Sequence, residues 1–299
     1  MRIAIMSDLH LEHDADLVRR AQAQAAEGLT DGMPIRWWLH LLEREASVGH
    51  PWLGPDLGSI RGVDLCILAG DIWQGTKSIS YAREVAAYCG CPVIAVAGNH
   101  DLYGHEMTAA LPEMSAAAVA TDGLVRLLND ARVDFEIGGR RVAVLGAMLW
   151  TDYNLLGEGK CADSMKAAFF GLNDHNSIAY RGTYFHPEHA LELHRRSRAW
   201  LADEVPKAVN DADVAIVVTH HGVVPEANPP VYRWGSLAPA FASDMTDDIR
   251  QWGCDLVASG HTHHPLDMTV GKTRVVSAPR GYVGTEPVAE QYAPMVVEL

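Results

Sequence analysis

The sequence has few basic residues and no long apolar segment. Its 24 lysines and arginines face 38 aspartates and glutamates, which gives a formal net charge of −14. Because nucleic-acid backbones and anionic lipids bind clustered Lys and Arg, this balance argues against an extended nucleic-acid or membrane partner. No apolar run approaches the roughly 20 residues of a membrane-spanning helix. A local positive site is still compatible with this charge if metal ions supply it.

A secretory signal is also missing from the pattern. The sequence begins with the strand-like segment 2–6, without a cationic segment or an apolar signal core before it. Cysteine is scarce, and five residues, an odd number, give no disulfide framework. Cys89 and Cys91 have the spacing of a redox or metal pair, but no second pair accompanies them, so a packing role is favoured. We therefore expect a protein of the reducing cytoplasm.

What the chain does contain is an alternation of apolar runs and helical patterns. This alternation is typical of parallel α/β sheets. In the middle of the chain, Gly138 and Gly139 lie between two short apolar runs and predict a hairpin, and therefore antiparallel pairing. We expect strands at 2–6, 63–69, 92–97, 125–128, 132–137, 141–145, 214–218, 255–259, 267–270, 273–277 and 295–298, and helices at 15–26, 35–46, 78–88, 105–120, 187–205 and 244–252.

We interpret residues 1–299 as one domain. The length permits two domains, but no linker, repeat or low-complexity tract divides the chain. Two irregular stretches interrupt the pattern, at about 14–58 and about 150–186. Both are interpreted as insertions at the rim of a site. The second is either an active-site lid or a region whose elements the pattern hides.

Polar side chains follow five of the predicted strands. One such group is weak evidence, because a strand end is often capped by polar residues. Five in order are strong evidence, since ligands bind at the carboxyl ends of strands in α/β sheets. Buried caps without partners would each cost about 1–3 kcal/mol. The residues are Asp8 and His10, Asp71, Asn99 and His100, His220, and His261 with His263.

These side chains form a mixed nitrogen and oxygen ligand set without cysteine. Such a set suits transition metals better than Ca²⁺ or Mg²⁺, whose sites are nearly all oxygen. There are too many ligands for one ion, and two ions about 3.5–4 Å apart would use them all. We expect manganese as the first choice, with iron, zinc, cobalt and nickel as alternatives. A pair of this kind serves phosphoester hydrolysis, whereas aminopeptidases usually carry more carboxylates.

The same residues resemble the motifs of the calcineurin-like metallophosphoesterase family. The resemblance implies a four-layer α/β/β/α sandwich of two mixed β-sheets, with helices on the outer faces, around a dinuclear metal site. The motifs span nearly the whole chain and are specific as a set. They are Asp8-x-His10, Gly70-Asp71, Gly98-Asn99-His100-Asp101, His220 and Gly260-His261-x-His263.

The resemblance further implies a role for each matched residue. The first ion would be held by Asp8, His10 and His263. The second would be held by Asn99, His220 and His261, and Asp71 would bridge both. His100 matches the family's position for the histidine that meets the phosphate and protonates the leaving oxygen.

One position departs from the family pattern. Many relatives carry an acidic residue three positions after the bridging aspartate, where it orients the catalytic histidine, and this chain has Gln74 there. An amide stabilises an imidazolium less than a carboxylate does, so Asp101 is the alternative partner. We therefore expect His100 and Asp101 to be the catalytic pair. His221 is a candidate for a second phosphate contact, and the alternative is that it has no role in the site.

The family includes several kinds of phosphoesterase. Ala97 replaces the arginine that protein phosphatases carry before Gly-Asn-His. An acidic, compact chain argues against a DNA-repair nuclease, and the small positive charge of the first insertion argues against a lipid-precursor hydrolase. We expect a phosphodiesterase that cleaves a small, soluble, nucleotide-like diester by attack of a metal-bridging hydroxide. The alternatives are a phosphomonoesterase of the same family and a non-catalytic metal-binding scaffold.

The small phosphoester substrate would contact two groups of residues. Asn99 and His100 would meet its phosphate group. Residues at the rim or in the lid would bind the remainder of the molecule. The candidates there are Asn173, His175, Arg181, Tyr184 and Arg280.

Overall fold

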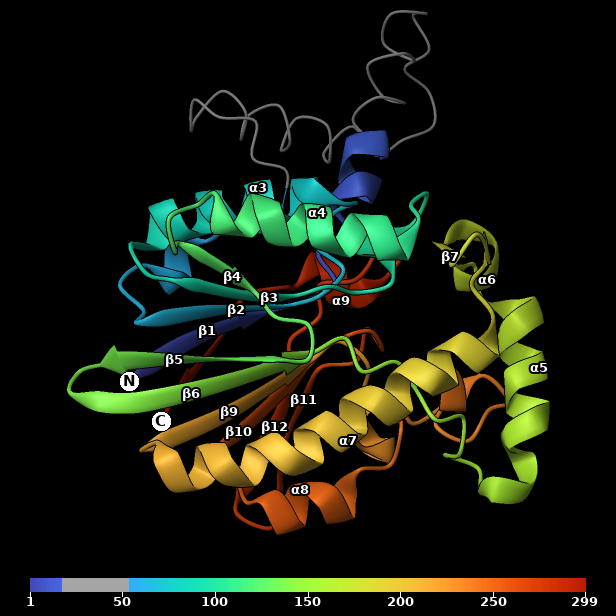
Figure 1. Ribbon diagram of the computed structural model, residues 1–299. Coiled ribbons are helices and arrows are strands. Elements are labelled where there is room, and N and C mark those ends of the chain that lie inside the picture. The colour runs from blue at the N-terminus through green and yellow to red at the C-terminus, as the bar shows by residue number, and fades with distance from the viewer. Residues whose placement is uncertain (18–53) are drawn as a thin grey trace, which may run out of the picture.

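The computed structural model describes residues 1–17 and 54–299 (Figure 1). The helix predicted at 35–46, and the part of the helix predicted at 15–26 beyond residue 17, lie outside the described residues. Residues 11–17 are helical. None of the described helices is long and apolar enough to cross a membrane.

Two mixed β-sheets form the centre of the molecule. The first has the order β13-β1-β2-β3-β4, and only β13 runs antiparallel to its neighbour. Its strands are β1 (Arg2–Met6), β2 (Leu65–Ala69), β3 (Val93–Val96), β4 (Val125–Leu127) and β13 (Met295–Glu298). The predicted parallel arrangement of the early strands is therefore confirmed.

The second sheet has the order β11-β12-β10-β9-β6-β5. Its edge strands β11 and β5 are antiparallel to their neighbours, and the four inner strands are parallel. The predicted hairpin at Gly138 and Gly139 joins β5 to β6, and both glycines have positive φ. The strands are β5 (Ala131–Ile137), β6 (Arg140–Ala147), β9 (Val214–Thr219), β10 (Leu256–Ser259), β11 (Leu266–Val270) and β12 (Thr273–Ser277).

Helices cover the outer face of each sheet. Figure 1 shows α3 (Thr76–Cys89) and α4 (Met107–Val119) over the first sheet, and α7 (Pro187–Asp211) and α8 (Thr246–Trp252) over the second. The four-layer α/β/β/α sandwich is thus confirmed. A short helix, α9 (Pro287–Glu290), precedes β13, and 3-10 turns lie at Gly58–Ile60, His100–Leu102, Glu158–Lys160, Pro225–Ala227 and Ala238–Ala240.

The central strands are apolar throughout because both of their faces are buried. In β2, Cys66 and Leu68 pack beneath the helices, whereas Leu65, Ile67 and Ala69 pack between the two sheets. Strand β9 divides its residues between two clusters in the same way. This double burial fixes the register of the strands, because a shift of one residue would exchange the two faces. It also fixes where their polar carboxyl ends lie.

The stretch 150–186 contains regular elements that the sequence pattern hides. They are α5 (Cys161–Gly171), α6 (Asp174–Ser177) and the hairpin of β7 (Ala179–Tyr180) and β8 (Thr183–Tyr184). Helix α5 leaves Phe170 exposed, so its apolar residues do not follow one clean face. Helix α7 was also predicted to be shorter. It continues through Pro206 because Val205 and Ala208 pack against the second sheet.

Candidate functional site

The expected metal ligands lie in the loops that follow β1, β2, β3, β9 and β10. The five ligands after β1, β2 and β10 have a left-handed backbone. The φ angles are 52° at Asp8, 47° at His10, 55° at Asp71, 69° at His261 and 50° at His263. This conformation is uncommon for residues other than glycine and costs about 1–3 kcal/mol at each position. Strain gathered at one place is characteristic of a functional site, where the surrounding structure holds residues that would otherwise relax.

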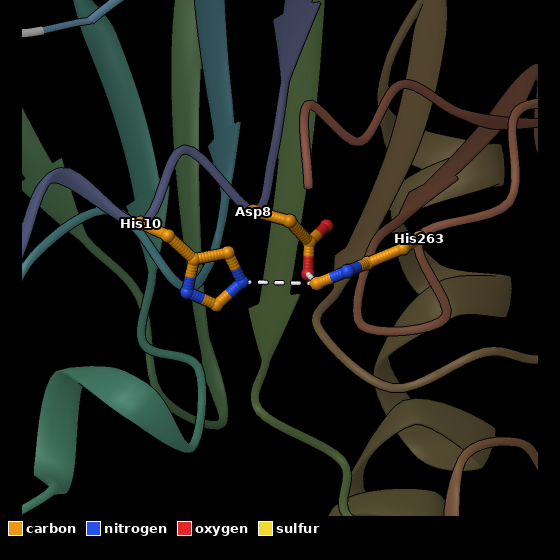
Figure 2. A group of neighbouring side chains, drawn as sticks. All are labelled: Asp8, His10 and His263. Carbon is orange, nitrogen blue, oxygen red and sulfur yellow. Dashed lines mark hydrogen bonds and ion pairs between the residues drawn. The ribbon is translucent and has the colours of Figure 1, made fainter. Parts of the chain in front are cut away.

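Asp8, His10 and His263 form a first group of candidate ligands (Figure 2). The Nδ1 atoms of His10 and His263 donate to the carboxylates of Glu12, at 3.1 Å, and Glu286, at 2.7 Å. Each neutral ring therefore presents a lone pair on Nε2, and these two Nε2 atoms are 2.9 Å apart. The Nε2 atom of His263 also lies 3.6 Å from Oδ1 of Asp8. Electron pairs that converge in this way fit a cation.

A second group forms around His220. Its Nδ1 donates to the carbonyl oxygen of Ala69 at 2.9 Å, which leaves Nε2 facing Oδ1 of Asn99 at 2.9 Å. Oδ2 of Asp71 lies 3.4 Å from the same Nε2. His261 completes the group, and its buried Nε2 has no hydrogen-bond partner among the described residues. Three acceptors and one unpartnered nitrogen again fit a metal ion.

Asp71 lies between the two groups of candidate ligands. Its Oδ2 lies 3.9 Å from Nε2 of His10 and 3.4 Å from Nε2 of His220. Gly98 makes this close packing possible, because a Cβ there would collide with the Asp71 carboxylate and come within 2.7 Å of the His220 ring. One carboxylate between two clusters of imidazoles is the donor arrangement that a pair of transition-metal ions requires.

The charges inside the site shift several pKa values. Burial lowers the pKa of His220, but the neighbouring Asp71 carboxylate outweighs burial and raises it to about 9. At His100, burial also lowers the pKa, but the carboxylates of Asp71 and Glu12 outweigh it and raise the pKa to about 9. Burial raises the pKa of Asp71, yet the surrounding histidines, His220 first, hold it well below its usual range. The site therefore favours positive charge, in the form of protons or of metal ions that displace them.

The side chain of Asn99 is fixed by Asp174, a residue that sequence reasoning did not select. Nδ2 of Asn99 donates to Oδ1 of Asp174 at 2.8 Å, so the amide oxygen must face His220. The Tyr103 hydroxyl donates to the same carboxylate oxygen at 2.6 Å. Asp174 is buried at the start of α6, within the stretch that was expected to be a lid. No local pattern indicates its partner, because the contact spans 75 positions.

His100 lies beside both groups and faces a cleft. Its backbone N–H donates to Oδ1 of Asp71 at 2.8 Å, and its ring stacks on Tyr103 with centroids 4.1 Å apart. Nδ1 contacts Oε1 of Glu12 at 3.1 Å, and Nε2 lies 3.1 Å from the hydroxyl of Tyr282. The ring is thus held at both nitrogens, with the Nε2 side directed into the cleft.

The partner of His100 corrects the sequence-based expectation. Asp101 is buried and accepts hydrogen bonds from the backbone N–H groups of Asp71 and Gly98 and from the Ser78 hydroxyl. It therefore fastens the two strand-end loops together and does not orient His100. Neither Gln74 nor Asp101 contacts Nδ1, because Glu12 does so. The position of Glu12 in the sequence could have indicated this contact, because Glu12 follows Asp8 and His10 by a few residues.

The cleft has a volume of about 830 Å³. Its floor contains candidate ligands and His100, and its walls are largely apolar. No lysine or arginine lines it in the described part of the chain. The lining residues are Asp71, Asn99, His100, Tyr103, Gly171, Leu172, Asn173, Asp174, Asn228, Pro229, Tyr232, Gly235, Ser236, Leu237, Ala238, Phe241, His261, Thr262, His263, His264, Pro265, Tyr282, Glu286, Pro287 and Val288.

Of the expected substrate contacts outside the metal-site motifs, only Asn173 lines this cleft. Arg280 is buried and donates to Oδ2 of Asp14 at 2.7 Å and to the Leu9 carbonyl oxygen at 3.0 Å. Arg181 lies on the surface, where it pairs with Glu192. Both arginines are therefore committed to partners away from the cleft, and their expected role in substrate binding is corrected.

The remaining candidates also lie outside the cleft lining. The ring of His221 packs behind His261, with centroids 4.1 Å apart, and burial holds its pKa well below the usual range. It supports the position of His261 and does not face a phosphate. His175 is buried, with Nδ1 donating to the Phe185 carbonyl oxygen at 2.8 Å, and Tyr184 is exposed.

Comparison with known proteins gives one family match. The family model for calcineurin-like phosphoesterases matches residues 1–265 of the chain. No curated protein sequence matches.

The chain also aligns with solved structures. The phosphopantetheinyl hydrolase PptH from Mycobacterium tuberculosis aligns with a TM-score of 0.62 at 18% identity, covering 98% of each chain. A phosphodiesterase from an archaeon covers 99% of this chain and 100% of its own, at 12% identity, with a TM-score of 0.36. At these identities the similarity of PptH supports the fold alone.

Proposed function

Because the chain belongs to the calcineurin-like phosphoesterase family, we propose that it is a metal-dependent phosphodiesterase for a small, soluble phosphodiester. One observation carries the proposal. Two groups of imidazoles and carboxylates lie on either side of Asp71, and members of both groups line one cleft together with His100.

The residues present fit two transition-metal ions. Asp8, His10 and His263 would hold one ion, and Asn99, His220 and His261 would hold the other, with Asp71 between them. Bound there, such ions supply Lewis acidity toward the phosphoryl oxygens and lower the pKa of a water molecule. Manganese is our first choice for both positions, and iron, zinc, cobalt and nickel share the required ligand preferences.

The chain's own contribution to the reaction centres on His100. Glu12 accepts the Nδ1 hydrogen and so holds the ring with Nε2 toward the cleft. The carboxylates of Asp71 and Glu12 raise the pKa of the His100 ring against the effect of burial, which favours its protonated form. In this position His100 donates a proton to the leaving oxygen as the P–O bond breaks, which is the work of a general acid.

The lining of the cleft supports the choice of a diester over a monoester. A phosphomonoester carries close to two negative charges at neutral pH, and proteins usually meet the second charge with Arg or Lys. No lysine or arginine lines this cleft in the described part of the chain. A diester carries one charge, and its second substituent fits walls formed by residues such as Leu172, Leu237 and Phe241.

The test compares two chromogenic substrates. Metal-free protein is reconstituted with Mn²⁺ and incubated with bis(p-nitrophenyl) phosphate and with p-nitrophenyl phosphate. We expect turnover of both, a higher kcat/KM for the diester, and loss of turnover in His100→Ala with its ions retained. A preference for the monoester would make the protein a phosphatase. If two ions bind but neither substrate is hydrolysed, the protein would be a non-catalytic metal-binding scaffold.

The substrate panel should also contain a phosphopantetheine diester. The similar M. tuberculosis structure is named a phosphopantetheinyl hydrolase. The pantetheine arm of such a diester is long, uncharged and partly apolar, which suits the apolar residues of the cleft walls. Cyclic nucleotides and nucleotide diesters complete the panel, because four aromatic side chains of the lining offer surfaces for stacking a base. These are Tyr103, Tyr232, Phe241 and Tyr282.

A further inference from the structure

Tyr282 occupies a defined place above the first group of ligands. Its backbone N–H donates to Oε2 of Glu286 at 2.9 Å, and the same oxygen accepts from Nδ1 of His263. Its ring packs against His10 with centroids 4.3 Å apart and against His263 at 5.0 Å. The phenol is therefore fixed by Glu286, which also orients His263, and by packing against the rings of His10 and His263.

The hydroxyl of Tyr282 meets His100 at the nitrogen that faces the cleft. The distance from this oxygen to Nε2 is 3.1 Å. Glu12 holds Nδ1 of His100, so the nitrogen that a substrate can meet is Nε2, which the Tyr282 hydroxyl contacts. Both residues line the cleft. An oxygen atom of a substrate that approaches Nε2 from the cleft must therefore also approach the phenol.

We propose that Tyr282 is a catalytic residue whose hydroxyl donates a hydrogen bond to the leaving oxygen beside His100. The inference rests on the proposed phosphodiesterase function. The oxygen of a water molecule forms the new P–O bond and releases a proton to solvent. As the bond to the leaving oxygen breaks, its electron pair passes to that oxygen, which takes a proton from His100. Tyr282 stabilises the growing negative charge and keeps its own proton, so the balance of the hydrolysis is unchanged.

The chemistry of the Tyr282 phenol suits the role of hydrogen-bond donor to the leaving oxygen. A phenol has an ordinary pKa of about 10, so the Tyr282 side chain is a neutral hydrogen-bond donor near neutral pH. A donor placed where charge develops is worth about 10²–10³ in rate at an enzyme site. The advantage is greatest for leaving groups that cannot carry the charge themselves, because these need the most stabilisation in the transition state.

The experiment is therefore Tyr282→Phe measured across leaving groups. Diesters of p-nitrophenol and of unsubstituted phenol are compared with the Mn²⁺-loaded protein. We expect a loss of about tenfold in kcat for the p-nitrophenyl ester and about a hundredfold for the phenyl ester. Tyr184→Phe is the matched control, because that hydroxyl is exposed and lies outside the cleft lining. An equal loss for both esters, or no loss, would overturn the proposal, since removal of packing affects all substrates alike.

A binding measurement separates this inference from the proposed function. Inorganic phosphate is titrated into the Mn²⁺-loaded protein by calorimetry, and Tyr282→Phe should bind it about five- to tenfold more weakly, the worth of one hydrogen bond. Unchanged phosphate binding contradicts the contact. If the wild-type protein binds phosphate but hydrolyses no diester, the proposed phosphodiesterase function is wrong. The phosphate affinities of wild type and Tyr282→Phe still test whether Tyr282 contacts the phosphate. If the wild type turns over and the variant matches it, only the role of Tyr282 fails.

Discussion

His10 and His263 present their Nε2 atoms to each other at 2.9 Å, although Glu12 and Glu286 hold the Nδ1 hydrogens of both rings. The two histidines are 253 positions apart. His10 follows a strand of the first sheet and His263 a strand of the second, so their meeting joins the carboxyl ends of both sheets. An ion at this point would bind to both halves of the sandwich.

Removal of metal should therefore destabilise the fold. An ion that binds only the native state, at a concentration 100 times its Kd, adds about 2.7 kcal/mol to the free energy of unfolding. We expect a chelator to lower Tm and Mn²⁺ to restore it, as followed by circular dichroism. An unchanged Tm at saturating Mn²⁺ would show that the ligands do not bind the ion across the two sheets.

Glu12→Gln should impair the reaction while leaving the shape of the site intact. Oε1 of Glu12 lies 3.1 Å from Nδ1 of both His10 and His100. The amide retains the size of the carboxylate but not its charge, so it stabilises the protonated His100 ring less. We expect a 10- to 100-fold decrease in kcat, about the usual cost of losing such a partner. Glu192→Gln, an exposed member of a surface pair, is the control, and equal kcat values for the two variants would refute the role of Glu12.

Asp174→Ala should weaken one of the two ion positions. Without this carboxylate, Nδ2 of Asn99 loses its acceptor, and the amide oxygen is no longer held toward His220. We expect the affinity for one equivalent of Mn²⁺ to fall by about 10- to 100-fold, while the other is retained. Calorimetric titration measures both. Asp163→Ala, an exposed change on α5, should bind as the wild type does, and the same result for Asp174→Ala would contradict the proposed support.

Arg280→Met should lower the stability of the fold and leave substrate binding unchanged, because Arg280 does not line the cleft. Its ion pair with Asp14 is buried, with side-chain exposures of 8% and 2%. Loss of one partner from a buried pair costs about 3–5 kcal/mol, because the other charge is left uncompensated. Arg181→Met removes an exposed pair and should cost about 0–1 kcal/mol. Urea unfolding compares them, and a raised KM without a loss of stability in Arg280→Met would reinstate its role in substrate binding.

Much of the fold and the residues at the strand ends could be predicted from the sequence because both depend on local signals. Continuous apolar runs indicate strands buried on both faces, and Asp8, Asp71 and His220 follow such runs directly. The structure brings these residues together because the carboxyl ends of strands from both sheets meet.

The residues that support the site were not predictable in the same way. Asp174 and Tyr282 reach their partners across 75 and 182 positions, through loops whose course depends on the packing of the whole molecule. The sequence showed the charge of Arg181 and Arg280 but not the carboxylates that pair with them. Only Glu12 stood close enough to Asp8 and His10 for its sequence position to suggest a part in the site.

A Mn²⁺ titration with turnover as the readout tests the central claim most directly. Metal-free protein receives increasing equivalents of Mn²⁺ while hydrolysis of bis(p-nitrophenyl) phosphate and bound metal are measured together. We predict that two ions bind per chain, that the rate rises until the second position is filled, and that a chelator abolishes it. Two bound ions without hydrolysis, or hydrolysis that persists after complete removal of metal, would contradict a dinuclear phosphodiesterase.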